Sequence, residues 1–134
     1  MTDEKPSQQA ILFKPSEDFV QLYANNTQLL SSNWDLEITF GQLDQKQGPN
    51  VVVQTASVTL PWPAVKVLSY FLHIYLLGHE FDFGRVIIPA GIIPEVPAEK
   101  PKEFAAVRDE TFQAFRQLYL EFIKANPEAA APKK

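Results

Sequence analysis

Three runs in the first half of the chain alternate hydrophobic and polar residues with a period of two. The first run begins at Val20 and can extend to Leu30, the second covers residues 34–40, and the third covers residues 51–60. This period is typical of β-strands that bury one face, so three strands are expected. The third run has one exception, because Gln54 occupies a position that the alternation assigns to an apolar residue.

Turn-forming residues separate these runs. Residues 31–33, with the sequence Ser-Ser-Asn, predict a turn between the first two strands. Gly41 marks either the end of the second strand or a bulge, and residues 44–50 predict the loop of a longer hairpin. Strands joined in this way form an antiparallel meander.

A long and unusually apolar helix is expected after the third strand. Pro61 or Pro63 suits its first turn, and Gly84 suits its end. At about 100° per residue its polar residues share one narrow stripe, which leaves two adjoining apolar faces. One face can cover the sheet, and the other needs a second cover. The first comprises Val65, Leu68, Leu72, Tyr75 and Leu76, and the second comprises Val67, Phe71, Ile74 and Phe81.

The last third of the chain predicts a linker and a second helix. The tripeptide Ile-Ile-Pro occurs twice between residues 87 and 94, and prolines indicate a stiff linker over residues 95–101. Residues 102–126 predict an amphipathic helix, which Asn126-Pro127 ends. Its main apolar positions are Phe104, Val107, Phe115, Leu118 and Phe122.

Together these elements predict an α+β fold. The expected architecture is an antiparallel three-stranded meander covered by one long apolar helix, with a C-terminal amphipathic helix after the Pro-rich linker. The core domain is expected over residues 19–94. A flexible lead over residues 1–18 carries a short apolar island at residues 11–13, and a disordered tail is expected over residues 127–134.

Composition excludes several classes of chemistry. The chain has 134 residues, which supports one domain, and it has no cysteine, which removes disulfides, thiolate nucleophiles and Cys-based zinc sites. A net charge of −4 and the lack of a basic run argue against nucleic acid as the main partner. The polar start is unlike a signal peptide, and the apolar stretch over residues 64–77 is too short to span a bilayer. A cytoplasmic protein without a membrane partner is expected.

The polar residues do not assemble into a recognisable catalytic motif. His73 and His79 lie six residues apart, which places them on different sides of one helix. His79 and Asp82 are helical neighbours that could hold a cation, but a solvated helix end explains them better. Asp35 and Glu37 share the wet face of a strand, and the same face lacks the basic residues that nucleic-acid binding needs. No enzyme, metal or cofactor is therefore expected.

Three short signatures carry a family resemblance. Tyr23-Ala24-Asn25 falls in the first predicted strand, the second strand contains Trp34-Asp35-Leu36 and Phe40-Gly41, and the helix carries Lys66, Tyr75 and Glu80-Phe81 before ending in Phe83-Gly84. In this order they resemble a small bacterial and archaeal family known as domain of unknown function 3467, over roughly residues 19–88. That family has no agreed activity, so the resemblance implies a fold unit and no catalytic residue. Members tend to open the helix with Ser-Pro and to end soon after Phe-Gly, whereas this chain continues for about forty residues.

The second apolar face of the helix leads to the functional expectation. It predicts a non-catalytic oligomerisation or protein-interaction domain that forms a homodimer or a higher even oligomer. Either the long helices of two subunits pack together, or the C-terminal helix folds back, in cis or swapped between subunits. Another protein could also dock on the C-terminal helix or on the Ile-Ile-Pro arm. The alternative is a chaperone or adaptor that binds extended apolar segments, because the order of elements and the acidity are similar to those of SecB-type export chaperones.

Overall fold

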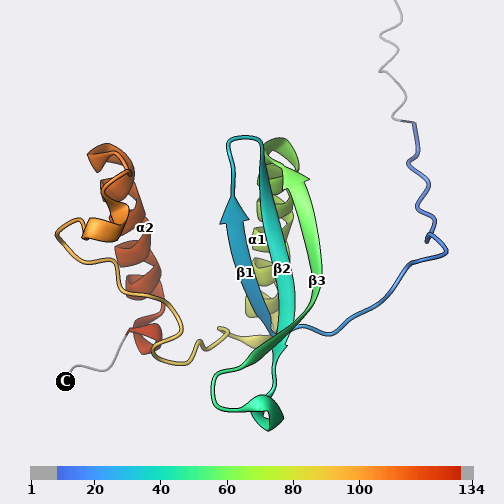
Figure 1. Cartoon of the computed structure of the whole chain (residues 1–134), viewed down its shortest axis with the longest axis horizontal. Coiled ribbons are helices and arrows are strands. Elements are labelled where there is room, and N and C mark those ends of the chain that lie inside the picture. Colours follow the sequence, from blue (N-terminus) through green and yellow to red (C-terminus); the bar gives the residue numbers. More distant parts are fainter. Residues whose placement is uncertain (1–8, 131–134) are drawn as a thin grey trace, which may run out of the picture. The chain divides into compact units, whose positions relative to one another are not determined.

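Three antiparallel strands form one sheet in the order β1-β2-β3 in the computed structural model, which describes residues 9–130 (Figure 1). Two α-helices complete the structure, so the predicted α+β class is confirmed. Residues 1–8 of the predicted lead and residues 131–134 of the predicted tail lie outside the described residues. The elements are β1 (Asn26–Ser31), β2 (Asp35–Leu43), β3 (Val52–Pro61), α1 (Trp62–Phe83) and α2 (Asp109–Ala125), with short 3₁₀ turns at Gln45–Gln47, Lys102–Phe104 and Pro127–Ala129.

The sheet has one apolar and one polar face, as the alternation predicts. Residues directly opposite each other in neighbouring strands point to the same side. In the central row Leu29 of β1, Ile38 of β2 and Val58 of β3 lie side by side. On the other side Thr39 donates a hydrogen bond to Ser57 at 3.4 Å. The apolar face comprises Leu29, Leu36, Ile38, Phe40, Ala56, Val58 and Leu60.

A β-bulge follows Phe40, where the register of β2 and β3 shifts. Phe40 lies opposite Ala56, whereas Gly41 lies opposite Gln54, so Thr55 is the extra residue. The bulge explains why Gln54 breaks the alternation, because one inserted residue turns it to the polar face. There its amide donates a 2.7 Å hydrogen bond to the side chain of Gln28.

The first strand begins later than its pattern predicts. The alternation starts at Val20, but β1 starts at Asn26, so the Tyr23-Ala24-Asn25 signature precedes the sheet. At this point the Oδ1 atom of Asn25 accepts a 3.0 Å hydrogen bond from the N–H of Leu43. A side chain therefore takes the place that a strand carbonyl would fill, and the ladder cannot continue toward Val20.

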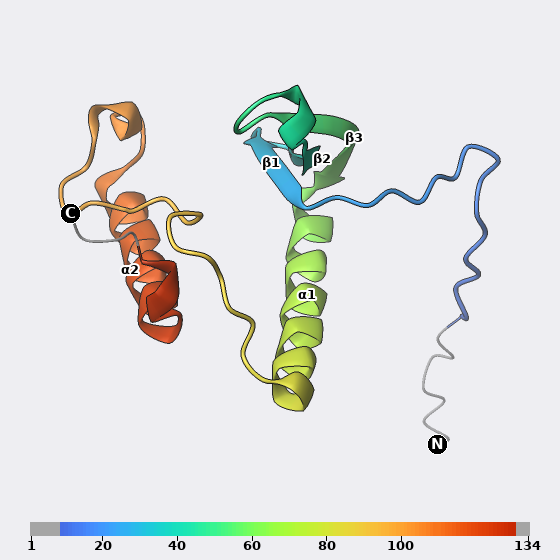
Figure 2. The ribbon, with the colours of Figure 1, turned by 90° about the horizontal axis from the view of Figure 1, so that it is seen from below.

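The long helix follows β3 without a loop, as Figure 2 shows. Pro61 ends the strand, Trp62 opens α1, and Pro63 occupies the first turn as expected. The helix ends at Phe83, and the N–H of Gly84 donates to the carbonyl of Glu80 at 2.9 Å. Gly84 has a φ of 93°, a left-handed conformation that favours glycine, which confirms the predicted stop.

The second helix is shorter than predicted. It begins at Asp109 instead of residue 102, so Phe104 and Val107 precede it. The backbone at Arg108 is extended, with a ψ of 145°, which breaks any helix that starts earlier. The ammonium group of Lys100 also donates a 2.9 Å hydrogen bond to the carbonyl of Val107. Acidic residues in the first turn of α2 then favour a start at Asp109, where the helix dipole is positive.

The chain divides after Phe71, within α1, into two compact units. The first contains the sheet and the beginning of α1. The second contains the end of α1, the Ile-Ile-Pro segment and α2.

Candidate interaction surfaces

The apolar residues of α1 are not buried within their own units. None of its residues is buried. On the second predicted face Phe71 is 50% exposed and Phe81 is 91% exposed, and Val67 and Ile74 are also exposed. On the face expected to cover the sheet only Val65 is half-buried, whereas Leu68, Leu72, Tyr75 and Leu76 are exposed. Both faces of α1 are therefore exposed within their own units.

The apolar face of the sheet is also incompletely covered. Its central strand is half-buried, but Leu29 is 61% exposed and Val58 is 46% exposed. On the opposite face polar side chains form hydrogen bonds with one another, so that face needs no apolar cover. The first unit by itself therefore leaves apolar surface open on the sheet as well as on the beginning of α1.

The second unit contains the small hydrophobic core that the described residues possess. Phe112 on the first turns of α2 is 1% exposed, and Ala129 is fully buried. The ring centroid of Phe104 lies 6.1 Å from that of Phe112, so Phe104 contributes to this core from its 3₁₀ turn and not from a helix face. Val107 is half-buried nearby in the chain.

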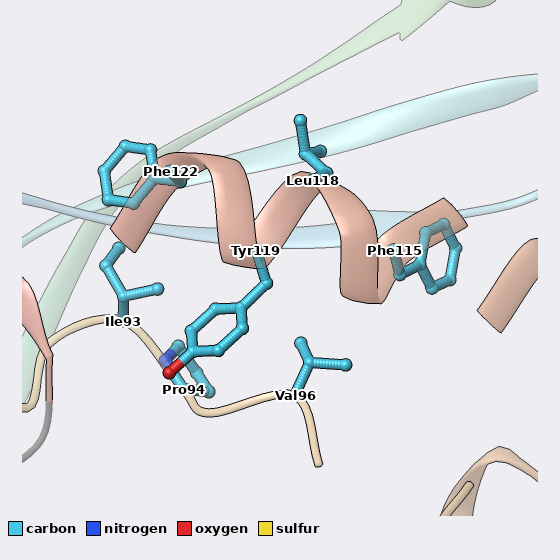
Figure 3. Close-up of a pocket in the computed structure, with 7 residues that line it drawn as sticks. All are labelled: Ile93, Pro94, Val96, Phe115, Leu118, Tyr119 and Phe122. Atoms are coloured by element: carbon cyan, nitrogen blue, oxygen red, sulfur yellow. The ribbon is translucent and has the colours of Figure 1, made fainter. Parts of the chain in front are cut away.

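An apolar pocket lies between α2 and the second Ile-Ile-Pro segment (Figure 3). It has a volume of about 340 Å³. Tyr119 points from α2 toward Pro94, and Ile93 and Val96 line the same side. Of the predicted partner residues, Phe115 and Leu118 are exposed at the pocket and Phe122 is half-buried. The Ile-Ile-Pro segment and α2 thus form one surface, which the sequence pattern had presented as two separate candidates.

Two ion pairs hold the loops of the second unit. The guanidinium of Arg85 donates to both carboxylate oxygens of Glu128 at 2.5 and 2.6 Å, and this hydrogen bonding lowers the pKa of Glu128 below its usual value. The ammonium of Lys100 lies 2.6 Å from the carboxylate of Asp109, and that hydrogen bond lowers the pKa of Asp109. Arg85 connects the end of α1 to the turn that follows α2.

The signature residues lie at junctions of the chain and not in one cluster. Asn25 and Gly41 meet at the start of β1, where the N–H of Asn25 donates to the carbonyl of Gly41 at 3.0 Å. Phe40 immediately precedes the bulge, and Tyr23 and Ala24 precede β1. At the far end of α1 the carboxylate of Glu80 accepts a 2.8 Å hydrogen bond from the N–H of Val86, beyond the Phe83-Gly84 stop.

Ser32 is a structural residue that the sequence patterns did not single out beyond its place in a turn. Its hydroxyl donates to the carboxylate of Asp35 at 2.7 Å and accepts from the N–H of Trp34 at 3.1 Å. Its carbonyl accepts from the indole N–H of Trp62 at 3.1 Å. Asp35 is thereby committed to the β1–β2 turn and is not part of a carboxylate pair with Glu37. The sequence signal that could have indicated this role is the position of Ser32, two residues before the Trp-Asp signature.

The polar residues considered for chemistry remain dispersed. The ring of His79 lies 5.1 Å from that of Phe83, and Glu37 accepts a 3.4 Å hydrogen bond from Thr39. Across residues 9–130 no three acidic or histidine side chains converge as metal ligands would. In the same part of the chain, neither α-helix combines the length and hydropathy needed to cross a bilayer.

Comparison with known proteins adds no relative: the chain matches no family model, no curated protein and no solved structure.

Proposed function

We propose that this chain is a non-catalytic oligomerisation domain that assembles with copies of itself into a dimer or a higher even oligomer. The observation that carries the proposal is that no residue of the apolar helix α1 is buried within its own unit. Burying half a dozen large apolar side chains contributes on the order of 10 kcal/mol before the entropic cost of association. A second copy offers an identical apolar helix and therefore a cover of matching character.

The test compares two charge substitutions on α1. Phe71→Glu places a carboxylate on the second apolar face, where an unpaired buried charge costs about 3 kcal/mol or more, so the association constant should fall by more than about 100-fold. His73→Glu is the matched control, because it introduces the same group on the polar stripe. Sedimentation equilibrium gives the masses and circular dichroism confirms that both variants remain folded. A folded Phe71→Glu variant that associates like the control contradicts the proposal.

Capture of extended apolar segments from other proteins is a second candidate function. The open edges of the sheet and its exposed Leu29 and Val58 support it, because extended peptides add to free strand edges. The full chain should then protect an unfolding client protein from aggregation at stoichiometric concentration. An oligomer that gives no protection limits the function to self-association.

We also propose that the chain is a divergent member of the domain of unknown function 3467. The support is that Asn25, Gly41, Glu80 and Gly84 each stabilise a junction of the fold, which is the role that family-wide signature residues without catalytic chemistry would have. A cytoplasmic location is proposed with it, since a chain without cysteine suits a reducing compartment.

A further inference from the structure

β3 is the longest strand of the sheet and lies at its edge. Edge strands in soluble proteins are normally short or protected by charged residues and proline, because their free backbone groups can pair with another chain. Residues 51–60 contain no charged residue and no proline. β1, at the other edge, has six residues against the ten of β3. β3 ends in Pro61 and contains the bulge at Thr55, but its ten uncharged residues make it the longer free edge of the sheet.

The direction of the free backbone groups on β3 follows from the β1–β2 turn. The N–H of Ser32 donates to the carbonyl of Asp35 at 2.9 Å, which makes these residues a hydrogen-bonded pair. Hydrogen bonding alternates along antiparallel strands, so Ile38 directs its backbone groups to β3 and bonds with Val58, its opposite residue. The backbone groups of Ser57 and Thr59 then point away from the sheet, to the free edge.

The regular part of β3 is symmetric about Val58. Thr55, the extra residue of the bulge, lies three positions before Val58, and Pro61, which has no N–H to donate, lies three positions after it. Both features end a ladder. Consider a second β3 that runs antiparallel to the first, with Val58 of both copies on the two-fold axis. Thr55 of one copy then lies opposite Pro61 of the other, so the pairing ends at these two residues on both sides.

We propose that β3 pairs with β3 of a second copy in this register, which joins the two sheets into one of six strands. Ser57 of each copy lies opposite Thr59 of the other as a hydrogen-bonded pair. Ala56 lies opposite Leu60, so the apolar face continues across the junction. The occupant is a second copy because the edge is self-complementary and carries no charge that would repel its equal. This inference rests on the proposed self-association and specifies its geometry.

The absence of native cysteine allows a direct test by single-cysteine cross-linking. Val58→Cys places two thiols across the axis in a non-hydrogen-bonded pair, whose Cα separation of about 4.5 Å lies within the range of a disulfide. Leu29→Cys is the matched control, because Leu29 lies in the same row of the same face but on β1. Under mild oxidation Val58→Cys should form a covalent dimer and Leu29→Cys should not. Equal cross-linking of both indicates packing of sheet faces and overturns the inference.

Thr59→Pro provides an independent measurement. It removes an N–H that points away from β2, so the sheet of each copy retains its own ladder, while two symmetric hydrogen bonds between the copies are lost. The dissociation constant should rise about tenfold or more, with an unchanged circular dichroism spectrum. A wild-type chain that is monomeric defeats the proposed function itself. A wild-type oligomer that neither cross-links at Val58 nor responds to Thr59→Pro defeats only the β3 geometry.

Discussion

Asn25 and Gly41 are hydrogen-bonded to each other where β1 begins to pair with β2, although each belongs to a different signature in the sequence. The N–H of Asn25 donates to the carbonyl of Gly41, and the side chain of Asn25 accepts from the N–H of Leu43, both at 3.0 Å. One residue thus satisfies two backbone groups of β2 at the point where β1 begins. These contacts give the signatures a structural role at the point where the chain enters the sheet.

Asn25→Ala should lower the free energy of unfolding by about 1 kcal/mol, because the N–H of Leu43 loses its protein acceptor. Urea denaturation of the full chain measures the change. Asn26→Ala is the control, since the Asn26 side chain makes no hydrogen bond within the described residues. Equal loss in both variants would show that the side chain of Asn25 does not stabilise the start of β1.

Gly41→Ala should destabilise the protein by about 1–3 kcal/mol. A Cβ atom at this position would lie 2.7 Å from Cγ1 of Val52 and 2.8 Å from the carbonyl oxygen of Val53, and strand backbone cannot yield cheaply. Gly78→Ala is the matched contrast, because its added Cβ meets nothing within 4 Å beyond the adjacent backbone of its own helix, and alanine favours the helix by up to about 1 kcal/mol. Thermal unfolding should therefore shift in opposite directions for the two variants.

Phe112→Ala should cost about 3 kcal/mol of stability, because it empties the centre of the small core of the second unit. Phe115→Ala removes the same ring from a position that is 47% exposed and should cost much less. Hydrogen exchange of the α2 amides reports the second unit separately from the sheet. Similar protection in both variants would place the core elsewhere.

The stability of the second unit should depend on acid pH through Glu128. Its pKa is lower in the folded chain because Arg85 donates hydrogen bonds to the carboxylate, so the folded state favours the ionised form. The stabilising contribution is present above the unfolded pKa and is lost as the pH falls through the folded pKa. Amide exchange in α2, followed from neutral to acid pH, should show this loss. In Glu128→Gln the rate of exchange should depend less on pH, because the contribution of Glu128 is absent. An unchanged pH profile in Glu128→Gln would show that the Arg85–Glu128 ion pair does not contribute to the acid sensitivity of the second unit.

Much of the sheet could be predicted from the sequence, since alternation reports directly which side of a strand is apolar. The third strand and the start of α1 follow their patterns, and Gly41 with the exceptional Gln54 contained the signal for a bulge. The beginning of β1 could not be predicted, because residues 20–25 alternate equally well and only a side-chain contact between Asn25 and Leu43 ends the ladder. The predicted start of the second helix at residue 102 was wrong for a similar reason, because Lys100 competes for the carbonyl of Val107.

The candidate surfaces were less predictable than the elements. Helical periodicity identified the face of α1 that contains Phe71, but it could not indicate that the face expected to cover the sheet is exposed as well. The pocket on α2 combines Ile93 with Tyr119 through a loop whose path no periodicity describes.

The most direct measurement of the central claim is the solution mass of the full wild-type chain by sedimentation equilibrium over a range of micromolar concentrations. The subunit mass is 15.2 kDa. If the apolar helix α1 is covered by a second copy, as proposed, the chain should sediment as twice that mass or as a higher even multiple. A folded, monodisperse species at the subunit mass across the whole range would contradict the account.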